Sequence, residues 1–263
     1  MDLGLKERVA LVCGASAGLG RAIATVLASE GAQLAINGRD PARLERTAAE
    51  IRGQTGATVH SFAADVSAAS EVGRLVSAVL ARFSRIDILV CNAGGPPATT
   101  FRDAQEPAWQ EALELSLLST IRLCRATVPQ MIEHRWGRVL CLTSIAAKQP
   151  GDGLILSTTA RTAVLGFAKA LADEVGPMGV TVNCLCPGYF ATDRMVELTR
   201  HRAHRAGVTA EEIAAKQVEG IPARRMGEPE ELAYVAAFLA SNRASYVTGT
   251  ALSVDGGMTR GIG

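Results

Sequence analysis

Aromatic side chains are scarce in this chain of 263 residues, where Phe, Trp and Tyr together make up 4%. Small residues take their place, with 26 glycines and frequent alanine in the apolar stretches. The apolar fraction is still 48%, which excludes a disordered chain and is ample for a core. This composition predicts helices packed closely on a sheet rather than a core built on large rings.

An excess of charge of one sign is also lacking. The chain has 27 basic and 26 acidic residues, a net charge of +1 at pH 7. This balance gives no electrostatic reason to expect binding of nucleic acid or of a membrane surface. No apolar run reaches the roughly 18 residues of a spanning helix, and the first residues do not resemble a signal peptide. We therefore expect a cytoplasmic protein that binds a small molecule.

Cysteine spacings typical of metal sites are absent. None of the six cysteines forms a C-x-x-C pair, and the four histidines are scattered, so no metal is expected. Most of the cysteines lie in β-branched runs and are predicted to be buried small hydrophobic residues. That pattern suits a reducing compartment.

Short apolar runs alternate with amphipathic stretches. Strands are expected at 9–14, 32–38, 57–66, 86–95, 137–144, 179–188 and 250–257, and helices at 20–31, 40–56, 67–83, about 106–135 and 155–176. The alternation predicts an α/β fold: a single Rossmann-type doubly wound domain over 1–263, with a parallel sheet of about seven strands and helices on both faces. Only about 189–222 breaks the rhythm, with two short helical pieces and a basic run from Arg200 to Arg205.

A glycine-rich turn, "CGASAGLGRA", joins the first expected strand to the first helix. Gly14, Gly18 and Gly20 follow the spacing G-x-x-x-G-x-G. Glycines there allow a tight turn and a close approach to a pyrophosphate, which rests on the helix N-terminus. The strand–turn–helix context makes a dinucleotide site the favoured interpretation.

The end of the second strand indicates which cofactor is preferred. An acidic residue there favours a free ribose 2′-hydroxyl, and an arginine favours a 2′-phosphate. Asp40 is followed by Pro41, so its expected role is to cap the next helix. Arg39 is then left to bind a phosphate, which favours NADP(H) over NAD(H).

Several motifs, in order along nearly the whole chain, resemble the short-chain dehydrogenase/reductase family. They are the glycine turn, "AADV", "CNAGG", "LTSIAA", "CPGYFAT" and "VTGTALSVDGG". The resemblance implies that Ser144 is the catalytic serine. It also implies a set of cofactor contacts: Gly14, Ser16, Gly18, Leu19, Gly20, Asp65, Val66, Asn92, Ala93, Gly94, Pro187, Gly188 and Thr192.

The family's catalytic tyrosine and lysine are missing at the expected positions. The residue 13 after Ser144 is Ser157, and the residue four further on is Arg161. Ser116 occupies the place of the family's catalytic asparagine. The resemblance thus implies a catalytic group of Ser144, Ser157, Arg161 and Ser116, of which only Ser144 is of the usual type, with Arg161 also on the cofactor ribose.

These departures leave several functions open. The favoured one is an NADP(H)-binding oxidoreductase acting on a carbonyl or alcohol with a modified catalytic group. The alternatives are a non-redox cofactor-binding sensor or structural partner, and a lyase or hydratase using the same pocket. Lys148 or Tyr189 could replace the missing proton donor.

The resemblance further implies a substrate lid at about 189–222 and a homotetramer paired through the helices at about 106–135 and 155–176. The basic run could bind a phosphate or carboxylate of the substrate, or it could be a solvated helix face or a subunit contact.

Overall fold

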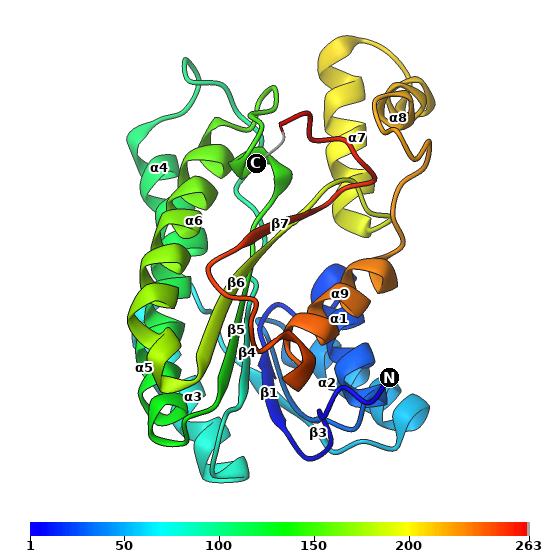
Figure 1. The fold of residues 1–263 in the computed structure, drawn as a ribbon. Helices are drawn as coiled ribbons and strands as arrows, with labels where there is room; N and C mark the ends of the chain where they lie inside the picture. The colour runs from blue at the N-terminus through cyan, green and yellow to red at the C-terminus, as the bar shows by residue number, and fades with distance from the viewer. Residues whose placement is uncertain (262–263) are drawn as a thin grey trace.

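A parallel sheet lies at the centre of the computed structural model, which describes residues 1–261 (Figure 1). Its strand order is β3-β2-β1-β4-β5-β6-β7, and every neighbouring pair is parallel. The strands are β1 (Val9–Val12), β2 (Gln33–Gly38), β3 (Val59–Ala63), β4 (Ile88–Cys91), β5 (Gly137–Leu142), β6 (Val180–Pro187) and β7 (Ala251–Val254). The predicted sheet of about seven parallel strands is confirmed.

Helices cover both faces of this sheet, as the alternation predicted (Figure 1). One face carries α1 (Gly18–Ser29), α2 (Pro41–Thr55) and α9 (Pro229–Leu239); the other carries α3 (Ala69–Phe83), α4 (Glu106–Leu113), α5 (Ser119–Glu133) and α6 (Ile155–Val175). The chain thus forms one doubly wound α/β domain. No helix among residues 1–261 is both long and apolar enough to cross a membrane.

Two further helices, α7 (Asp193–Ala206) and α8 (Ala210–Glu219), lie beyond the carboxyl end of β6 (Figure 1). They fall within 189–222, where the sequence predicted two helical pieces. Thr192 caps α7 by accepting a hydrogen bond from the backbone N–H of Met195, and Thr209 caps α8 through a capping box with Glu212. Both helices therefore have defined starts outside the sheet-covering layers.

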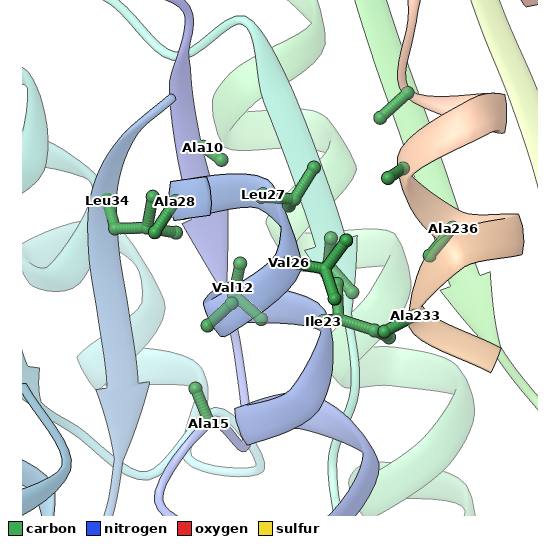
Figure 2. Close-up of a cluster of buried hydrophobic side chains, with 14 of the residues drawn as sticks. Ala10, Val12, Ala15, Ile23, Val26, Leu27, Ala28, Leu34, Ala233 and Ala236 are labelled. Atoms are coloured by element: carbon green, nitrogen blue, oxygen red, sulfur yellow. The ribbon is translucent and has the colours of Figure 1, made fainter. Parts of the chain in front are cut away.

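The core on the α1 face is built mainly from aliphatic residues and alanine, as the low aromatic content predicted (Figure 2). Ile23 and Leu27 of α1 are completely buried between the sheet and α9. Ala233 and Ala236 of α9 meet them with very short side chains. Alanine at this contact lets α9 approach α1 closely, which holds α1 against β1 and so positions the glycine turn between them.

The core on the opposite face contains a row of cysteines. Cys91, Cys141 and Cys184 are direct neighbours in register across β4, β5 and β6. All six cysteines of the chain are buried and unpaired, which confirms the burial predicted for those in the strand-like runs. Burial raises the pKa of the Cys13 thiol to about 12, so it stays protonated at neutral pH.

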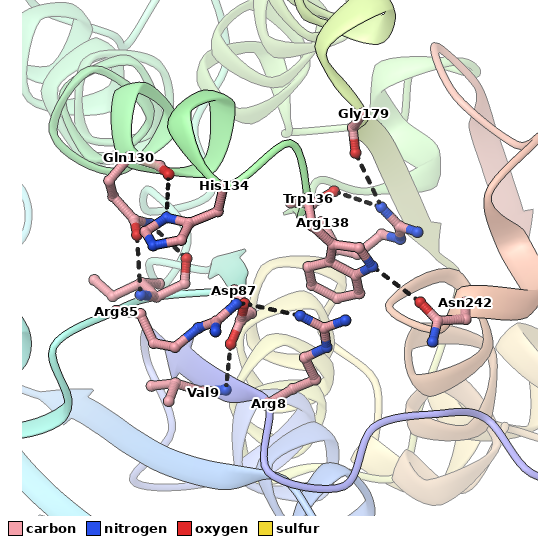
Figure 3. Close-up of polar contacts among 12 residues, drawn as sticks. Arg8, Val9, Arg85, Asp87, Gln130, His134, Trp136, Arg138, Gly179 and Asn242 are labelled. Carbon is pink, nitrogen blue, oxygen red and sulfur yellow. Dashed lines mark hydrogen bonds and ion pairs between the residues drawn. The ribbon is translucent and has the colours of Figure 1, made fainter.

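A polar cluster closes the amino end of the sheet, away from the glycine turn (Figure 3). Asp87, only 2% exposed, accepts a hydrogen bond from the backbone N–H of Val9 at 2.9 Å. Its carboxylate also pairs with Arg8 at 3.3 Å and with Arg85. The guanidinium of Arg8 stacks on the Trp136 ring, 3.8 Å from its centre. One buried carboxylate thus joins the start of β1 to the segment before β4.

Replacing Asp87 with asparagine should lower the free energy of unfolding by about 2 kcal/mol, because charge-assisted hydrogen bonds to a buried group are lost. The cost stays at this level because both arginines retain partial contact with water. Asp173→Asn is the matched control: its ion pair with Lys169 is exposed, and the expected change is below about 0.5 kcal/mol. Urea unfolding of the two variants measures the difference. Equal stabilities would show that the cluster does not contribute.

Candidate active site

Three glycines of the turn between β1 and α1 stand where a larger residue would be strained or would collide. Gly14 and Gly18 have φ values of +59° and +54°, which disfavour any residue with a Cβ. A Cβ on Gly20 would lie 2.2 Å from the carbonyl oxygen of Gly14. Asn92, after β4, fixes the turn from the other side, donating from Nδ2 to the carbonyl oxygens of Cys13 and Gly14 at 3.2 and 3.3 Å.

The first turn of α1 presents unpaired backbone N–H groups at this glycine turn. Its N-cap residue, Ala17, has no side chain that could accept from them. Leu19 packs against the core below. Ser16 lies against the end of β2, and its carbonyl oxygen accepts from Thr47 Oγ1 at 3.2 Å. Free N–H groups at the positive end of a helix can bind an anion.

The ends of β2 and β3 are tied together next to this turn. Buried Asn37 donates from Nδ2 to the carbonyl oxygens of Phe62 and Ala64 at 2.9 and 3.1 Å. Asp65 follows, and its Oδ1 accepts from both the N–H and the hydroxyl of Ser67 at 2.9 and 2.6 Å. Desolvation opposes ionisation of Asp65, but these hydrogen bonds outweigh it and hold the pKa of the carboxyl below its ordinary value. The turn therefore carries a fixed carboxylate.

Arg39 and Asp40 differ in how they are held. Asp40 Oδ1 accepts from the N–H groups of Ala42 and Arg43 at 2.9 and 3.0 Å, so the predicted helix cap is confirmed. Arg39 is exposed and has no hydrogen-bond partner in the described part of the chain. Val66, by contrast, is buried in the core. An exposed guanidinium at the end of β2 is therefore available to a ligand.

Ser144, Ser157 and Arg161 lie around the ends of β4 and β5. Ser144 begins a short helix after β5, and its Oγ accepts from the N–H of Ala146 at 3.1 Å. Ser157 is on the first turn of α6, and its hydroxyl has no hydrogen-bond partner among residues 1–261. Arg161, one turn further on, donates to the carbonyl oxygens of Thr143 and Gly94, the latter at 2.9 Å. The guanidinium thus links the segments that leave the two central strands.

The charge of Arg161 is held in an unusual setting. Burial, and then the charge of Arg194, lower its pKa to about 10. The group still carries its proton at neutral pH. Its Nε is buried without a partner. Ala93, just before the Gly94 carbonyl that Arg161 binds, packs against the core.

The predicted continuous helix at about 106–135 is interrupted around Ser116. A π-helical turn, Glu114–Leu118, separates α4 from α5. The hydroxyls of Ser119 and Thr120 donate back to the carbonyl oxygens of Leu115 and Ser116 at 2.6 and 2.9 Å. Such back-bonding competes with the regular ladder and favours a wider turn. The Ser116 hydroxyl is buried and unpartnered.

The loop after β6 lies against the glycine turn. Pro187 ends β6, and a Cβ on Gly188 would lie 2.7 Å from the Cβ of Asp255. The Thr192 methyl group is 3.6 Å from the position of a Cβ on Gly18. The loop that begins the 189–222 segment therefore touches the turn between β1 and α1.

An ion pair also joins α7 to α2. Arg43 Nη2 lies 3.5 Å from Asp193 Oδ2, with both groups largely exposed. The first turn of α7 is thus held on the side of the sheet that carries the glycine turn.

The two candidate proton donors have partners of their own. Lys148 Nζ donates to Ser253 Oγ on β7 at 3.4 Å. The Tyr189 hydroxyl accepts from Arg202 at 3.2 Å. The residues of the basic run have different surroundings. Arg202 contacts Tyr189, whereas Arg200 and Arg205 are exposed.

Two residues of this region, Asn37 and Arg194, lie outside the sequence motifs. Arg194, on the first turn of α7, donates to the carbonyl oxygen of Pro96 at 3.1 Å. A sequence signal exists for each. Asn37 is a polar residue within an apolar strand, and Arg194 is a cation at a helix N-terminus, where the helix dipole disfavours it. Among the described residues no cluster of His, Cys, Asp and Glu is arranged to hold a metal ion.

The strand order reverses between β1 and β4, and the glycine turn sits at that point. These features define the Rossmann-type class of α/β proteins, in which ligands bind beyond the carboxyl ends of the strands. A family model described as enoyl-(acyl carrier protein) reductase matches residues 14–259. The 3-oxoacyl-[acyl-carrier-protein] reductase FabG of Aquifex aeolicus is 34% identical over 258 residues, 98% of this chain and 100% of that protein. The chain belongs to the short-chain dehydrogenase/reductase family of oxidoreductases.

Solved structures agree closely with this fold. L-Sorbose reductase from Gluconobacter frateurii, in complex with NADPH and L-sorbose, has a TM-score of 0.95 and 33% identity, with 100% of both chains covered. A putative NAD(P)-dependent gluconate 5-dehydrogenase from Beutenbergia cavernae, with bound NADP, has a TM-score of 0.89 and 34% identity. That match covers 98% of this chain and 99% of the other.

Proposed function

We propose that this protein is an NADP(H)-dependent oxidoreductase that interconverts a carbonyl and an alcohol on a small molecule. The observation that carries the proposal is the glycine turn, where a Cβ on Gly20 would collide with the backbone and where α1 begins with free N–H groups. Such a turn fits the pyrophosphate of a dinucleotide cofactor. The relatives reported above are named as reductases or dehydrogenases, which supports redox chemistry over a lyase or a non-redox sensor.

The remaining cofactor contacts are proposed from the family resemblance. Asp65 and Val66 would border the adenine, and Arg39 would bind the ribose 2′-phosphate. Asn92, with Ala93 and Gly94, would lie along the middle of the cofactor. Pro187, Gly188 and Thr192 would border the nicotinamide, since their loop touches Gly18. NADPH and NADP in two similar structures support the same cofactor here.

The exposed position of Arg39 leads to a prediction about cofactor choice. We expect NADPH to bind more tightly than NADH, and Arg39→Ala to weaken NADPH about tenfold while leaving NADH unchanged. One charge-assisted hydrogen bond to the 2′-phosphate, at the low end of about 1.5–3 kcal/mol because the site is exposed, accounts for this factor. Fluorescence titration of both cofactors measures it. A preference for NADH that survives Arg39→Ala would contradict the assignment.

The catalytic group is proposed to be Ser144 with Ser157 and Arg161 at the positions where the family carries its tyrosine and lysine, and with Ser116 nearby. When bound, the nicotinamide donates or accepts a hydride at the substrate carbon. The Ser144 hydroxyl, whose oxygen accepts from Ala146, keeps its hydrogen free to donate to the substrate oxygen. Arg161 supplies a fixed positive charge beside the cofactor ribose. It does not shuttle protons, because its pKa of about 10 keeps it protonated.

A proton for the substrate oxygen must come from another group, since a serine hydroxyl at 157 is a weak acid. Lys148 and Tyr189 remain the proposed donors, although each has a hydrogen-bond partner within the protein. Lys148→Met and Tyr189→Phe separate them: loss of the true donor should lower kcat about 10²- to 10⁴-fold and remove a limb of the pH profile.

The function is tested by a screen of carbonyl compounds with NADPH and NADH, and of alcohols with the oxidised cofactors, followed by the absorbance of the reduced nicotinamide. Turnover of at least one carbonyl compound with NADPH supports the proposal. Tight NADPH binding without turnover of any substrate would instead favour the non-redox sensor. Absence of cofactor binding would overturn the proposal altogether.

The protein is also expected to be a homotetramer. α6 exposes a stripe of small residues, Ala163, Gly166 and Ala170, beside α5, and such a face lets two helices pack closely. A second exposed apolar face on α9 includes Tyr234, 63% exposed, and Phe238, 40% exposed. A subunit that pairs with a copy of itself through each of two different faces builds a tetramer with dihedral symmetry.

Light scattering at micromolar concentration measures the mass directly. Gly166→Arg, which blocks the α6 face alone, should reduce the tetramer to a dimer through the α9 face. A monomeric mass for the unaltered protein would contradict this prediction.

A further inference from the structure

Two arginines from distant parts of the chain converge on the short loop after β4. A Cβ on Gly95 would lie 3.5 Å from an Nη of Arg161 and 3.8 Å from an Nη of Arg194. Arg161 comes from α6 and Arg194 from the first turn of α7. They donate to the carbonyl oxygens on either side, Gly94 and Pro96, at 2.9 and 3.1 Å. The two guanidinium groups therefore lie on the same side of Gly95, where the loop has no side chain.

This pair of positive charges lacks a matching pair of carboxylates. Arg161 has no acidic partner within 4 Å among residues 1–261. The acidic partner of Arg194 is Glu197, 3.6 Å away on the same helix and largely exposed. Arg161 Nε is covered by other protein atoms, so a bound group would contact the Nη atoms. A negatively charged group between the two guanidinium groups would neutralise both charges.

We propose that Arg161 and Arg194 together bind a carboxylate of the substrate, so that this oxidoreductase acts on a hydroxy or oxo acid. The inference rests on the proposed function, because it takes the substrate of an oxidoreductase to bind next to Arg161, a member of the proposed catalytic group. A carboxylate suits this position since two guanidinium groups can each present parallel N–H donors to its two oxygens. One of the similar solved structures is named for gluconate, which carries such a group.

The position of Arg194 gives the carboxylate a second effect. Arg194 belongs to the segment 189–222, whereas Arg161 is anchored to the ends of β4 and β5. An anion bound between them neutralises the repulsion of two like charges, while Arg194 keeps the first turn of α7 on the loop after β4 through its hydrogen bond to Pro96. A neutral substrate of the same shape would leave that repulsion in place. Substrate charge therefore contributes directly to the affinity for the substrate.

The test measures the binding of alcohols and carboxylates to the complex of the protein with NADPH. Because an alcohol cannot be oxidised by a reduced cofactor, no turnover disturbs the measurement. The probes are two matched pairs, D-gluconate against D-glucitol and benzoate against benzamide, titrated by calorimetry into the full-length protein saturated with NADPH. Within each pair the carboxylate is replaced by a neutral group. We expect at least one carboxylate to bind ten or more times more tightly than its neutral counterpart.

Arg194→Gln should remove that difference and leave the dissociation constant of NADPH within twofold of the original. Arg74→Gln is the control: Arg74 also has one acidic neighbour on its own helix, Glu71 at 3.9 Å, and its loss changes the net charge equally. It should preserve the full preference for the carboxylate. Thermal unfolding shows whether each variant is folded.

Three results would overturn the inference. They are equal binding of charged and neutral probes by the NADPH complex, retention of the carboxylate preference in folded Arg194→Gln, and tighter binding of inorganic phosphate than of either carboxylate. Failure of NADPH itself to bind would instead refute the proposed function, so the two failures are distinguishable.

Discussion

Gly20→Ala is expected to weaken NADPH binding by at least about 100-fold, or about 2.7 kcal/mol. The new Cβ would lie 2.2 Å from the carbonyl oxygen of Gly14 and 2.7 Å from Nδ2 of Asn92. Neither atom can move alone, because Asn92 holds the carbonyl oxygens of Cys13 and Gly14. The turn must open, and the N–H groups of α1 then no longer converge on the pyrophosphate.

The same clash should cost about 1–3 kcal/mol of folding stability, as overpacking in rigid surroundings does. Gly53→Ala is the control within the same protein. A Cβ there meets no atom within 4 Å on α2, so the helix should gain up to about 1 kcal/mol and cofactor affinity should be unchanged. Fluorescence titration and urea unfolding of both variants give the two quantities. Normal NADPH affinity in a folded Gly20→Ala protein would remove the main support for the proposed function.

Restoring the family's usual pair, by Ser157→Tyr together with Arg161→Lys, is expected to lower native kcat/KM about 100-fold and to create no reduction of generic ketones. Arg161 spans the carbonyl oxygens of Thr143 and Gly94, which belong to segments leaving two different strands. A lysine has one nitrogen and cannot present the same fork. Without the fork the charge at position 161 and the adjoining segments shift, and a misplacement of about 1 Å in a catalytic site can cost about 100-fold.

The opposite result is equally informative. If Ser157 and Arg161 are decayed remnants, the surrounding pocket still fits a phenol and an ammonium group. The double variant should then reduce simple ketones up to about 10²- to 10⁴-fold faster than the unaltered protein, the gain expected of a positioned acid. Steady-state kinetics with cyclohexanone and similar neutral ketones, at saturating NADPH, distinguish the two cases. Arg161→Lys alone shows how much of the loss comes from the arginine.

Local patterns in the sequence were sufficient to predict the strands of the sheet and the glycine turn. Period and turn residues predict every strand and the helices that cover the sheet as far as α6, and Asp40 followed by Pro41 predicts a cap that the structure confirms. The break at Glu114–Leu118 was missed, because apolar periodicity does not register hydroxyls that bond back to the helix backbone. A Ser-Thr pair inside a long helix is the signal that could have indicated it.

The meeting of Arg161 and Arg194 could not be predicted, for a different reason. The contact depends on the position of α7 relative to the loop after β4, and no local sequence pattern predicts that position. The inward turn of Arg202 toward Tyr189 is similar, since the basic run looks uniform in the sequence while its members face different surroundings. Contacts between segments far apart in the chain decide which arginine meets a ligand.

The row of buried cysteines in the sheet allows local unfolding of the native protein to be followed through the reactivity of its own thiols. Cys91, Cys141 and Cys184 lie side by side in three central strands, and none of the six thiols reaches the surface. An alkylating reagent can therefore reach them only when the strands separate from the helices that cover them. When reclosing is faster than alkylation, the labelling rate follows the population of opened molecules and hence the free energy of opening. Mass spectrometry after timed alkylation would therefore measure the free energy of opening of the sheet without an introduced label.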